Sequence, residues 1–369
     1  MSPGQVEIQL IAVLTAVACA LPGVFLVLRR VALMSDAISH AILPGLVLAF
    51  FVTEDLGSPL LIVAAAATGV LTVVLIEALA RTGRVKEDAA IGLVFPLLFS
   101  VGVILIARFA GDVHLDVDAV LLGELAFAPF NRFAVGGTDL GPRAAWVMGP
   151  ILLLNVAFLA VFFKELKLST FDAGLAAALG FAPTALHYGL MALVSVTAVG
   201  AFDAVGSVLV VALMIAPPAT AYLLTDRLTV MLGLSAAVGA ACAVAGYWAA
   251  HALDSSIAGA MATICGIAFA LAFAFAPERG LVAQVRRRRA RRRAFAQKML
   301  AVHLLHHEDT PEEARECRIP HLQEHLRWTP DFARQAVQAA VRDGYIQRQA
   351  DHLSLTDRGR GYAQESMVD

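Results

Sequence analysis

The feature that most constrains this chain is a series of nine apolar runs, most of them about the 17–25 residues that a membrane-spanning helix needs. With 59% hydrophobic and only 16% charged residues, the 369-residue chain is too apolar for a water-soluble protein of this length. The expected fold class is therefore an all-α polytopic membrane protein. The runs cover residues 8–28, 37–51, 59–80, 88–107, 144–163, 184–200, 205–224, 228–252 and 257–276.

The distribution of Lys and Arg between the runs predicts how the helices are oriented. Short cytoplasmic loops of membrane proteins carry an excess of basic residues. Basic residues follow the odd-numbered runs, whereas the loops at 53–55, 201–203 and 253–255 are acidic or neutral. This alternation favours nine spans with the N-terminus outside and the C-terminus in the cytoplasm. Eight spans are the alternative, if a short run such as 184–200 does not cross completely.

A change in composition near residue 280 divides the chain into two expected domains. Residues 1–280 hold the apolar runs and form the transmembrane domain. Residues 281–294 form an Arg-rich linker that contains RRRRARRR at 286–293, a run that suits anionic lipid headgroups next to a membrane span. Residues 295–369 are rich in Arg, His, Glu and Gln and are expected to form a separate water-soluble domain.

The segment RRVALMSDAISHAILPG places a carboxylate and an imidazole inside an apolar stretch. Asp36 and His40 are four residues apart, so on a helix they share one face. Ionisable groups within a membrane usually face a water-filled path or each other, and an oxygen with a nitrogen ligand suits Mn²⁺, Fe²⁺ or Zn²⁺. The alternative is structural, with Asp36 as the cap of the second helix and His40 as a hydrogen-bonded histidine of the bundle.

Two further groups of acidic residues are candidates for a cation path. Glu87 and Asp88 open the fourth run, where carboxylates also stabilise a helix N-terminus without any metal. In the outer loop 108–143, acidic residues alternate with a histidine, and an extended strand would place them on one face. We interpret this second group as a vestibule that attracts cations, with a solvated polar loop as the alternative. Its members are Asp112, His114, Asp116, Asp118 and Glu124.

Two segments depart from the simple pattern of spans. Residues 172–179 are rich in Ala and Leu, and Gly180 follows as an expected C-cap. A short isolated helix on the cytoplasmic side is stabilised by docking on a partner protein or by lying on lipid headgroups. The second segment is the seventh run, in which Pro217 and Pro218 are expected to kink or end the helix.

Four segments together resemble a known family, the ABC-3 permease subunits of ATP-binding-cassette importers for manganese, zinc and iron. The resemblance covers nearly all of residues 1–280, in the order of the family. It implies a multi-pass protein of the bacterial plasma (inner) membrane that forms a permease dimer. It also implies two cytoplasmic ATPase subunits and an extracytoplasmic metal-binding protein as partners. The segments are VLRRVALMSDAISHAILPG, EDAAIGLVFPLLFSVGVIL, LKLSTFDAGLAAALGF and GSVLVVALMIAPPATAYLL.

The resemblance also implies roles for particular residues. Asp36 and His40 match an Asp-and-His motif at the start of the second span and are expected to line the metal path or its gate. Glu87, Asp88 and Asp203 are expected path residues as well. The helix that couples to the ATPase is expected to contain Phe171, Asp172, Ala176 and Gly180.

The expected function is transport of a divalent metal, not catalysis. The chain has no GxxxxGK[ST] phosphate loop, so ATP is expected to bind and be hydrolysed only on the partner subunits. No permanently bound cofactor is expected, because the metal is the transported ion. The alternative function is a membrane-anchored metal-responsive regulator, but an anchor needs only one span.

The C-terminal domain has the predicted element order of a winged helix-turn-helix domain. Helices are predicted at 295–307, 321–328 and 330–343, followed by a hairpin over 345–356 and a further helix capped by Thr356. The segment AVRDGYIQRQADHLSLTDRGRGYA resembles the wing region of metal-dependent repressors of the manganese and iron type. By that association manganese is the favoured substrate, with zinc and iron as alternatives.

Histidines in this domain suggest a metal-sensing role. His303 and His307 are four residues apart, as are His321 and His325, a spacing common in metal sites. Our hypothesis is a cytoplasmic sensor that inhibits transport when the cell is replete, and the alternative is a set of surface histidines. DNA binding is not expected, because the predicted recognition helix 330–343 carries charges of both signs. A regulatory or protein-contacting role is favoured instead.

Overall fold

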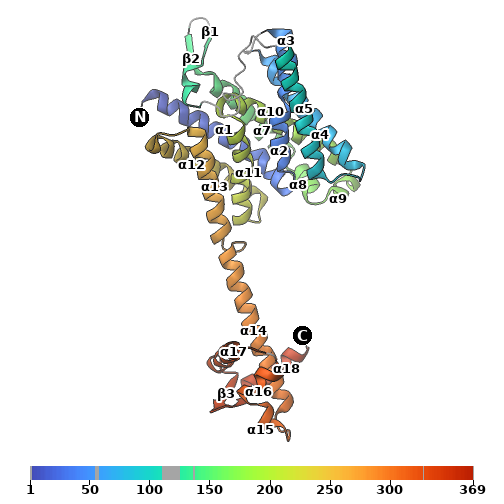
Figure 1. The fold of residues 1–369 in the computed structure, drawn as a ribbon, viewed down its shortest axis with the longest axis vertical. Helices are drawn as coiled ribbons and strands as arrows, with labels where there is room; N and C mark the ends of the chain where they lie inside the picture. The colour runs from blue at the N-terminus through green and yellow to red at the C-terminus, as the bar shows by residue number, and fades with distance from the viewer. Residues whose placement is uncertain (1, 55–57, 110–124, 136–137, 327, 369) are drawn as a thin grey trace. The chain divides into compact units, whose positions relative to one another are not determined.

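The structure is a computed structural model that describes residues 2–54, 58–109, 125–135, 138–326 and 328–368. It divides into two compact parts, unit 1 (Met1–Gly280) and unit 2 (Leu281–Asp369) (Figure 1). Each unit has its own cluster of buried hydrophobic side chains.

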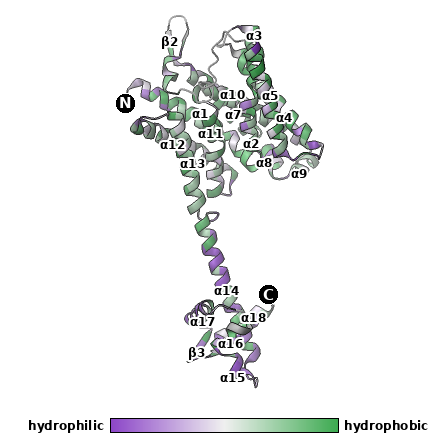
Figure 2. Cartoon of the chain, in the orientation of Figure 1, coloured by the Kyte–Doolittle hydropathy of each residue, from purple (hydrophilic) through white to green (hydrophobic). Residues whose placement is uncertain are grey.

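Unit 1 consists of long apolar helices and one small hairpin. Within the described residues, nine helices are long and apolar enough to cross a membrane, which is the number that the apolar runs predicted. Figure 2 shows apolar residues along the length of these helices. The elements are α1 (Pro3–Leu28), α2 (Leu33–Ala41), α3 (Leu43–Thr53), α4 (Pro59–Arg81), α5 (Glu87–Phe109), η1 (Leu125–Phe130), β1 (Arg132–Val135), β2 (Thr138–Pro142), α7 (Arg143–Val161), α8 (Phe163–Phe171), α9 (Ala173–Ala178), α10 (Pro183–Val205), α11 (Ser207–Leu224), α12 (Leu228–Leu253) and α13 (Ile257–Phe275).

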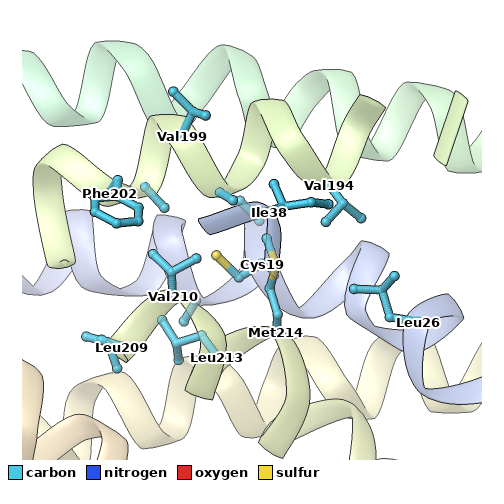
Figure 3. Close-up of a cluster of buried hydrophobic side chains, with 14 of the residues drawn as sticks. Cys19, Leu26, Ile38, Val194, Val199, Phe202, Leu209, Val210, Leu213 and Met214 are labelled. Carbon is cyan, nitrogen blue, oxygen red and sulfur yellow. The ribbon is translucent and has the colours of Figure 1, made fainter. Parts of the chain in front are cut away.

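The second span is divided at Ile42 into α2 and α3. Pro44, in the first turn of α3, has no N–H to donate to the carbonyl of His40, which accounts for the division. The short helix α2 lies inside the core of unit 1. Its Ile38 side chain is fully buried, and Figure 3 shows it among side chains of α1, α10 and α11, including Cys19 and Met214. This packing fixes which face of α2 points away from the core.

A buried hydrogen bond compensates for a proline inside α1. Pro22 has no N–H, so the carbonyl of Ala18 loses its ordinary partner four residues further on. The side-chain amide of Asn155 in α7 donates a hydrogen bond to that carbonyl at 2.8 Å and another to Thr197 Oγ1 in α10 at 3.0 Å. Asn155 and Thr197 are fully buried, so this contact satisfies a polar backbone group where lipid offers none.

Helices α1 and α11 cross in close contact. Helix α11 continues through Pro217 and Pro218 as far as Leu224, so the proline pair does not end the helix. Because Pro218 has no N–H, the carbonyl of Met214 has no partner four residues further on. Gly23 of α1 lies against this carbonyl, since a Cβ at Gly23 would come within 2.1 Å of the Met214 oxygen. A glycine is therefore required at this crossing.

The antiparallel hairpin of β1 and β2 is attached to the first turns of α1. The guanidinium of Arg132 lies 3.2 Å from Glu7 Oε2 and also contacts Asp139. A hydrogen bond from the Gly141 N–H, together with Arg132, holds the pKa of Asp139 below its usual range. The hairpin thus marks the end of unit 1 that lies at the start of α1.

Unit 2 is made of helices and a second antiparallel hairpin. Its core contains Leu300, Leu322, Val337 and Leu353. The elements are α14 (Leu281–His307), α15 (Glu313–Glu316), α16 (Ile319–His325), α17 (Pro330–Arg342), β3 (Ile346–Gln349), β4 (His352–Leu355) and α18 (Asp357–Val368).

Local structure at three places in unit 2 follows from the sequence. The Arg-rich segment 281–294 is helical and forms the first half of α14, consistent with the good helix propensity of Arg. Thr329 is the N-cap residue of α17, although its side chain makes no capping hydrogen bond. Thr356 does cap α18, because its Oγ1 accepts a hydrogen bond from the Gly359 N–H at 3.0 Å.

Candidate metal path, coupling segment and histidine cluster

Asp36 and His40 lie together on one face of α2. Asp36 Oδ1 and His40 Nε2 are 3.3 Å apart, and the two side chains are 42% and 29% exposed within the single chain. The capping interpretation of Asp36 is wrong, since the N-cap of α2 is Ala32 and no side chain caps this helix. Both ionisable groups therefore lie on the face of α2 opposite its buried residues, where two ligand atoms are accessible.

The imidazole of His40 lies between two aromatic rings of α5. The centroid of its ring is 5.9 Å from that of Phe95 and 6.5 Å from that of Phe99. Apolar rings provide no further metal ligands on this side. The Asp36–His40 pair thus has the composition of a weak, open cation site, which suits passage better than retention.

The other predicted path residues on described helices are not part of α2. Glu87 and Asp88 are exposed in the first turn of α5, eight and seven residues before Phe95, or about 12 and 10 Å along the helix. Asp203 lies in α10, but its side chain is outside what the structure describes. The five vestibule residues also lie outside the described residues; these are Asp112, His114, Asp116, Asp118 and Glu124.

Helices α8 and α9 form the predicted coupling segment. Asp172 caps α9, because its Oδ1 accepts a hydrogen bond from the Leu175 N–H at 2.8 Å. Gly180 has a φ of 86°, and its N–H and that of Phe181 donate to the carbonyls of Ala177 and Ala176, each at 3.0 Å. This pairing is a Schellman motif, which ends the helix as Gly180 predicted.

The exposed side of the coupling segment is apolar. Phe171 is 64% exposed, and Leu175 and Leu179 are also exposed. Ala176 is fully buried, so its role is to seat α9 on unit 1 and not to contact a partner. A surface with three large apolar side chains in a short polar-capped segment is typical of a protein interface.

A polar network that the sequence analysis did not identify joins the coupling segment to the end of α1. Arg29 donates from Nε to Thr170 Oγ1 at 3.1 Å and from Nη2 to Ser169 Oγ at 3.0 Å. Its third nitrogen, Nη1, lies 3.3 Å from His187 Nδ1 in α10. One guanidinium therefore contacts both α8 and α10.

The same network continues into α4. His187 Nε2 lies 2.6 Å from Glu77 Oε1, and Tyr188 donates a hydrogen bond to Glu77 Oε2 at 2.7 Å. Arg81 also donates to Glu77 Oε2, at 3.0 Å. The network thus connects four helices, and it places the basic ends of α1 and α4 beside α8 at one end of unit 1. No local pattern predicts it, because Arg29 and Thr170 are 141 residues apart.

The predicted histidine pair of α14 has an acidic neighbour. Ligand atoms of His303, His307 and Glu316 all lie within 4.8 Å of one another. In the part of the chain that the structure describes, this is the only group of three or more His, Cys, Asp or Glu with that geometry. His321 joins it through a short contact with Glu316. The side chain of His325, the other predicted ligand, is outside the described residues.

Cys317 lies next to this group but is not suited to it as a thiolate. Burial, with the nearby carboxylates of Glu313 and Glu308, raises the pKa of the Cys317 thiol to about 11. The Cys317 sulfur is also not among the ligand atoms that lie within 4.8 Å of one another. The ligand atoms available at this place are imidazole nitrogens and a carboxylate.

Comparison with known proteins assigns the chain to a family. It is 49% identical over 358 residues to the zinc transport system membrane protein TroD of Treponema pallidum, with 97% of each chain covered. It is also 49% identical over 270 residues to the manganese transport system membrane protein MntD of Bacillus subtilis, covering 73% of this chain and 91% of that protein. The solved structure of PsaBC from Streptococcus pneumoniae in complex with Fab superposes with a TM-score of 0.63 and 28% identity, over 76% of this chain and 94% of that one. Residues 6–276 match the ABC 3 transport family, and the chain belongs to that family.

Proposed function

We propose that this chain is the permease subunit of an ABC importer that moves a divalent transition metal into the cytoplasm of a bacterium. The observation that carries the proposal is the family match over residues 6–276, which includes all nine candidate spans. Similar proteins are named for zinc and manganese transport, so the substrate class is a divalent transition metal. ATP is hydrolysed by a partner subunit, since this chain has no phosphate-loop sequence.

In this proposal Asp36 and His40 contact the ion as it passes. The pair offers one oxygen and one nitrogen ligand, and it lies on a helix whose opposite face is fixed in the core. A partly dehydrated cation needs ligands of this kind to cross an apolar wall, and it must also leave again. Glu87, Asp88 and Asp203 serve the same path at other levels.

The coupling segment contacts the ATPase and follows the conformational change that ATP hydrolysis drives in it. Phe171, Leu175 and Leu179 provide the apolar contact with the ATPase, and the Arg29 network transmits its movement to α1, α4 and α10. Unit 2 is cytoplasmic in this proposal and has a winged-helix fold that regulates transport or contacts another protein. Its order of helices followed by the hairpin β3–β4 supports that assignment.

The test is metal accumulation in cells that express the chain with its ATPase and its extracytoplasmic binding protein. Mn, Zn and Fe are measured in cells with wild-type chain, Asp36→Ala or His40→Ala at equal membrane levels. Glu54→Gln and His251→Ala are the controls, because both residues are exposed; Glu54 follows the end of α3, and His251 lies in α12.

We expect one metal to accumulate and the two path variants to lose most of that uptake, while both controls retain it. That result identifies the substrate as well as the path. Normal uptake by Asp36→Ala and His40→Ala would remove the pair from the path. Accumulation of none of the three metals by the wild-type system would contradict the importer assignment itself.

A further inference from the structure

Unit 2 holds a compact group of side chains that the transport function does not use. His303 and His307 come from α14, Glu316 from α15 and His321 from α16. The rings of His303 and His307 have centroids 4.8 Å apart, and ligand atoms of both lie within 4.8 Å of a Glu316 oxygen. Three separate elements thus direct imidazole and carboxylate groups to one place.

This group is largely removed from water. His303 is 8% exposed, and the Glu316 and His321 side chains are 12% and 15% exposed. A carboxylate with so little exposure is unfavourable unless it has a partner, and the imidazole of His321 is in short contact with Glu316. The enclosure separates this group from ordinary solvated surface histidines.

A second contact orients the first imidazole. His303 Nε2 lies 3.2 Å from the backbone carbonyl of Glu316. A carbonyl can only accept, so the neutral ring donates its Nε2 proton there and keeps the Nδ1 lone pair. Metal-bound histidines commonly show this arrangement, in which the far nitrogen is held by a backbone carbonyl.

From this geometry we propose that His303, His307, Glu316 and His321 bind one divalent cation of the Zn²⁺ type. Three imidazole nitrogens and one carboxylate oxygen complete a tetrahedral set, and imidazole-rich sites suit zinc better than manganese, which prefers oxygen ligands. Zinc ligands at about 2.0–2.1 Å from the metal lie about 3.3 Å from one another in a tetrahedron. The ligand atoms of His303, His307 and Glu316, at most 4.8 Å apart, therefore close by up to about 1.5 Å around the ion. His321, which contacts Glu316, is the fourth ligand and has to move toward the two other histidines.

Metal binding at this place joins parts of unit 2 that are otherwise weakly connected. Helix α15 has four residues, which is too short to be stable alone. A bound cation would tie α15 and α16 to the C-terminal end of α14. This site is separate from the path, so its existence does not depend on the transport function or on which metal is transported.

The test uses the purified full-length chain in detergent, dialysed against Zn²⁺, with the bound zinc per chain measured by mass spectrometry. The double variant His307→Ala with Glu316→Gln removes two of the four ligands. It leaves His303, the ligand with the least exposure, in place, so that the fold is disturbed as little as possible. His306→Ala with Glu312→Gln is the matched control, since these neighbours are exposed and outside the group. Both pairs are also made in a background of Asp36→Ala with His40→Ala, which removes binding by that pair from the comparison.

We expect the ligand variant to bind one zinc fewer per chain than the control in both backgrounds. Equal zinc binding by the ligand and control variants would overturn the proposal. Because a variant can misfold, wild-type chain is also titrated with Co²⁺ alone. Intense visible absorption of a four-coordinate cobalt site, displaced by Zn²⁺, supports the proposal. A spectrum of six-coordinate cobalt only would contradict it.

Discussion

Asp36 and His40 are accessible because their neighbours in α2 are not. Ala37, Ile38 and Ala41 are fully buried, and an α-helix cannot bury one face without fixing the direction of the other. The aromatic rings of Phe95 and Phe99 then limit His40 to one open side. Apolar packing of α2 therefore determines where the pair lies. The carboxylate of Asp36 and the imidazole of His40 determine which ligands it offers.

Arg29 provides the clearest prediction at the scale of a residue. Lys at this position keeps the positive charge but cannot donate to Thr170, Ser169 and His187 together, because it lacks the planar fork of Arg. We expect Arg29→Lys to lower metal uptake roughly tenfold, since each hydrogen bond to a charged group contributes about 1.5–3 kcal/mol. Uptake is measured at equal membrane levels.

Arg30 is the natural control for this experiment. It has the same charge and the adjacent position but is exposed, and Arg30→Lys is expected to leave uptake unchanged. Equal loss in both variants would mean that positive charge in this loop matters and the network does not. Normal uptake by Arg29→Lys would show that the hydrogen bonds of Arg29 are dispensable for coupling.

Residues close in sequence were predictable, and residues that meet across the fold were not. The Asp36–His40 and His303–His307 pairs follow from helical spacing alone. Glu316 joins the second pair only because the chain reverses between α14 and α15, and no periodicity encodes that reversal. The same reason hides the contact of Arg29 with Thr170.

At the scale of elements, the crossing of α1 and α11 depends on a glycine opposite a proline-exposed carbonyl. Gly23→Ala would place a methyl group within 2.1 Å of the Met214 oxygen, where no flexible side chain can move away. We expect this change to lower the apparent melting temperature in detergent, since overpacking costs about 1–3 kcal/mol.

Gly149→Ala is the matched change for that prediction. A Cβ at Gly149 meets no atom within 4 Å, so the variant should melt at the wild-type temperature or slightly above it. Melting of Gly23→Ala at the same temperature as Gly149→Ala would mean that α1 and α11 separate easily.

The lengths of the spans were predictable because each must cross the apolar interior of a bilayer. Their order was predictable because polar segments separate the apolar runs along the chain. What escaped prediction lies where local rules compete. The charge of segment 281–294 did not indicate that it is helical, although Arg is a good helix former and α14 runs through it. Of the two outcomes expected for Pro217 and Pro218, a kink or an end, the helix does not end there, since α11 continues to Leu224.

For the whole molecule, the nine candidate spans among the described residues predict that the two ends of the chain lie on opposite sides of the membrane. All four native cysteines are buried, so a membrane-impermeant thiol reagent should give little background. We expect Ser255→Cys to react in intact cells and Arg84→Cys to react only after permeabilisation. This result is expected from the prediction that the basic loops are cytoplasmic.

Both positions are exposed within the single chain, so accessibility in the monomer does not distinguish them. Reaction of both variants in intact cells, or of neither, would contradict the nine-span arrangement. A reversed pattern would invert the orientation of the protein and move unit 2 outside the cell.

The hydrogen bond between Asn155 and the Ala18 carbonyl has a consequence for biogenesis. The two residues are 137 positions apart, so α1 is synthesised and enters the bilayer long before its partner exists. Until α7 arrives, the first helix carries an unsatisfied carbonyl in a solvent that cannot hydrogen-bond. The first span therefore becomes fully compatible with lipid only after the fifth has entered the bilayer.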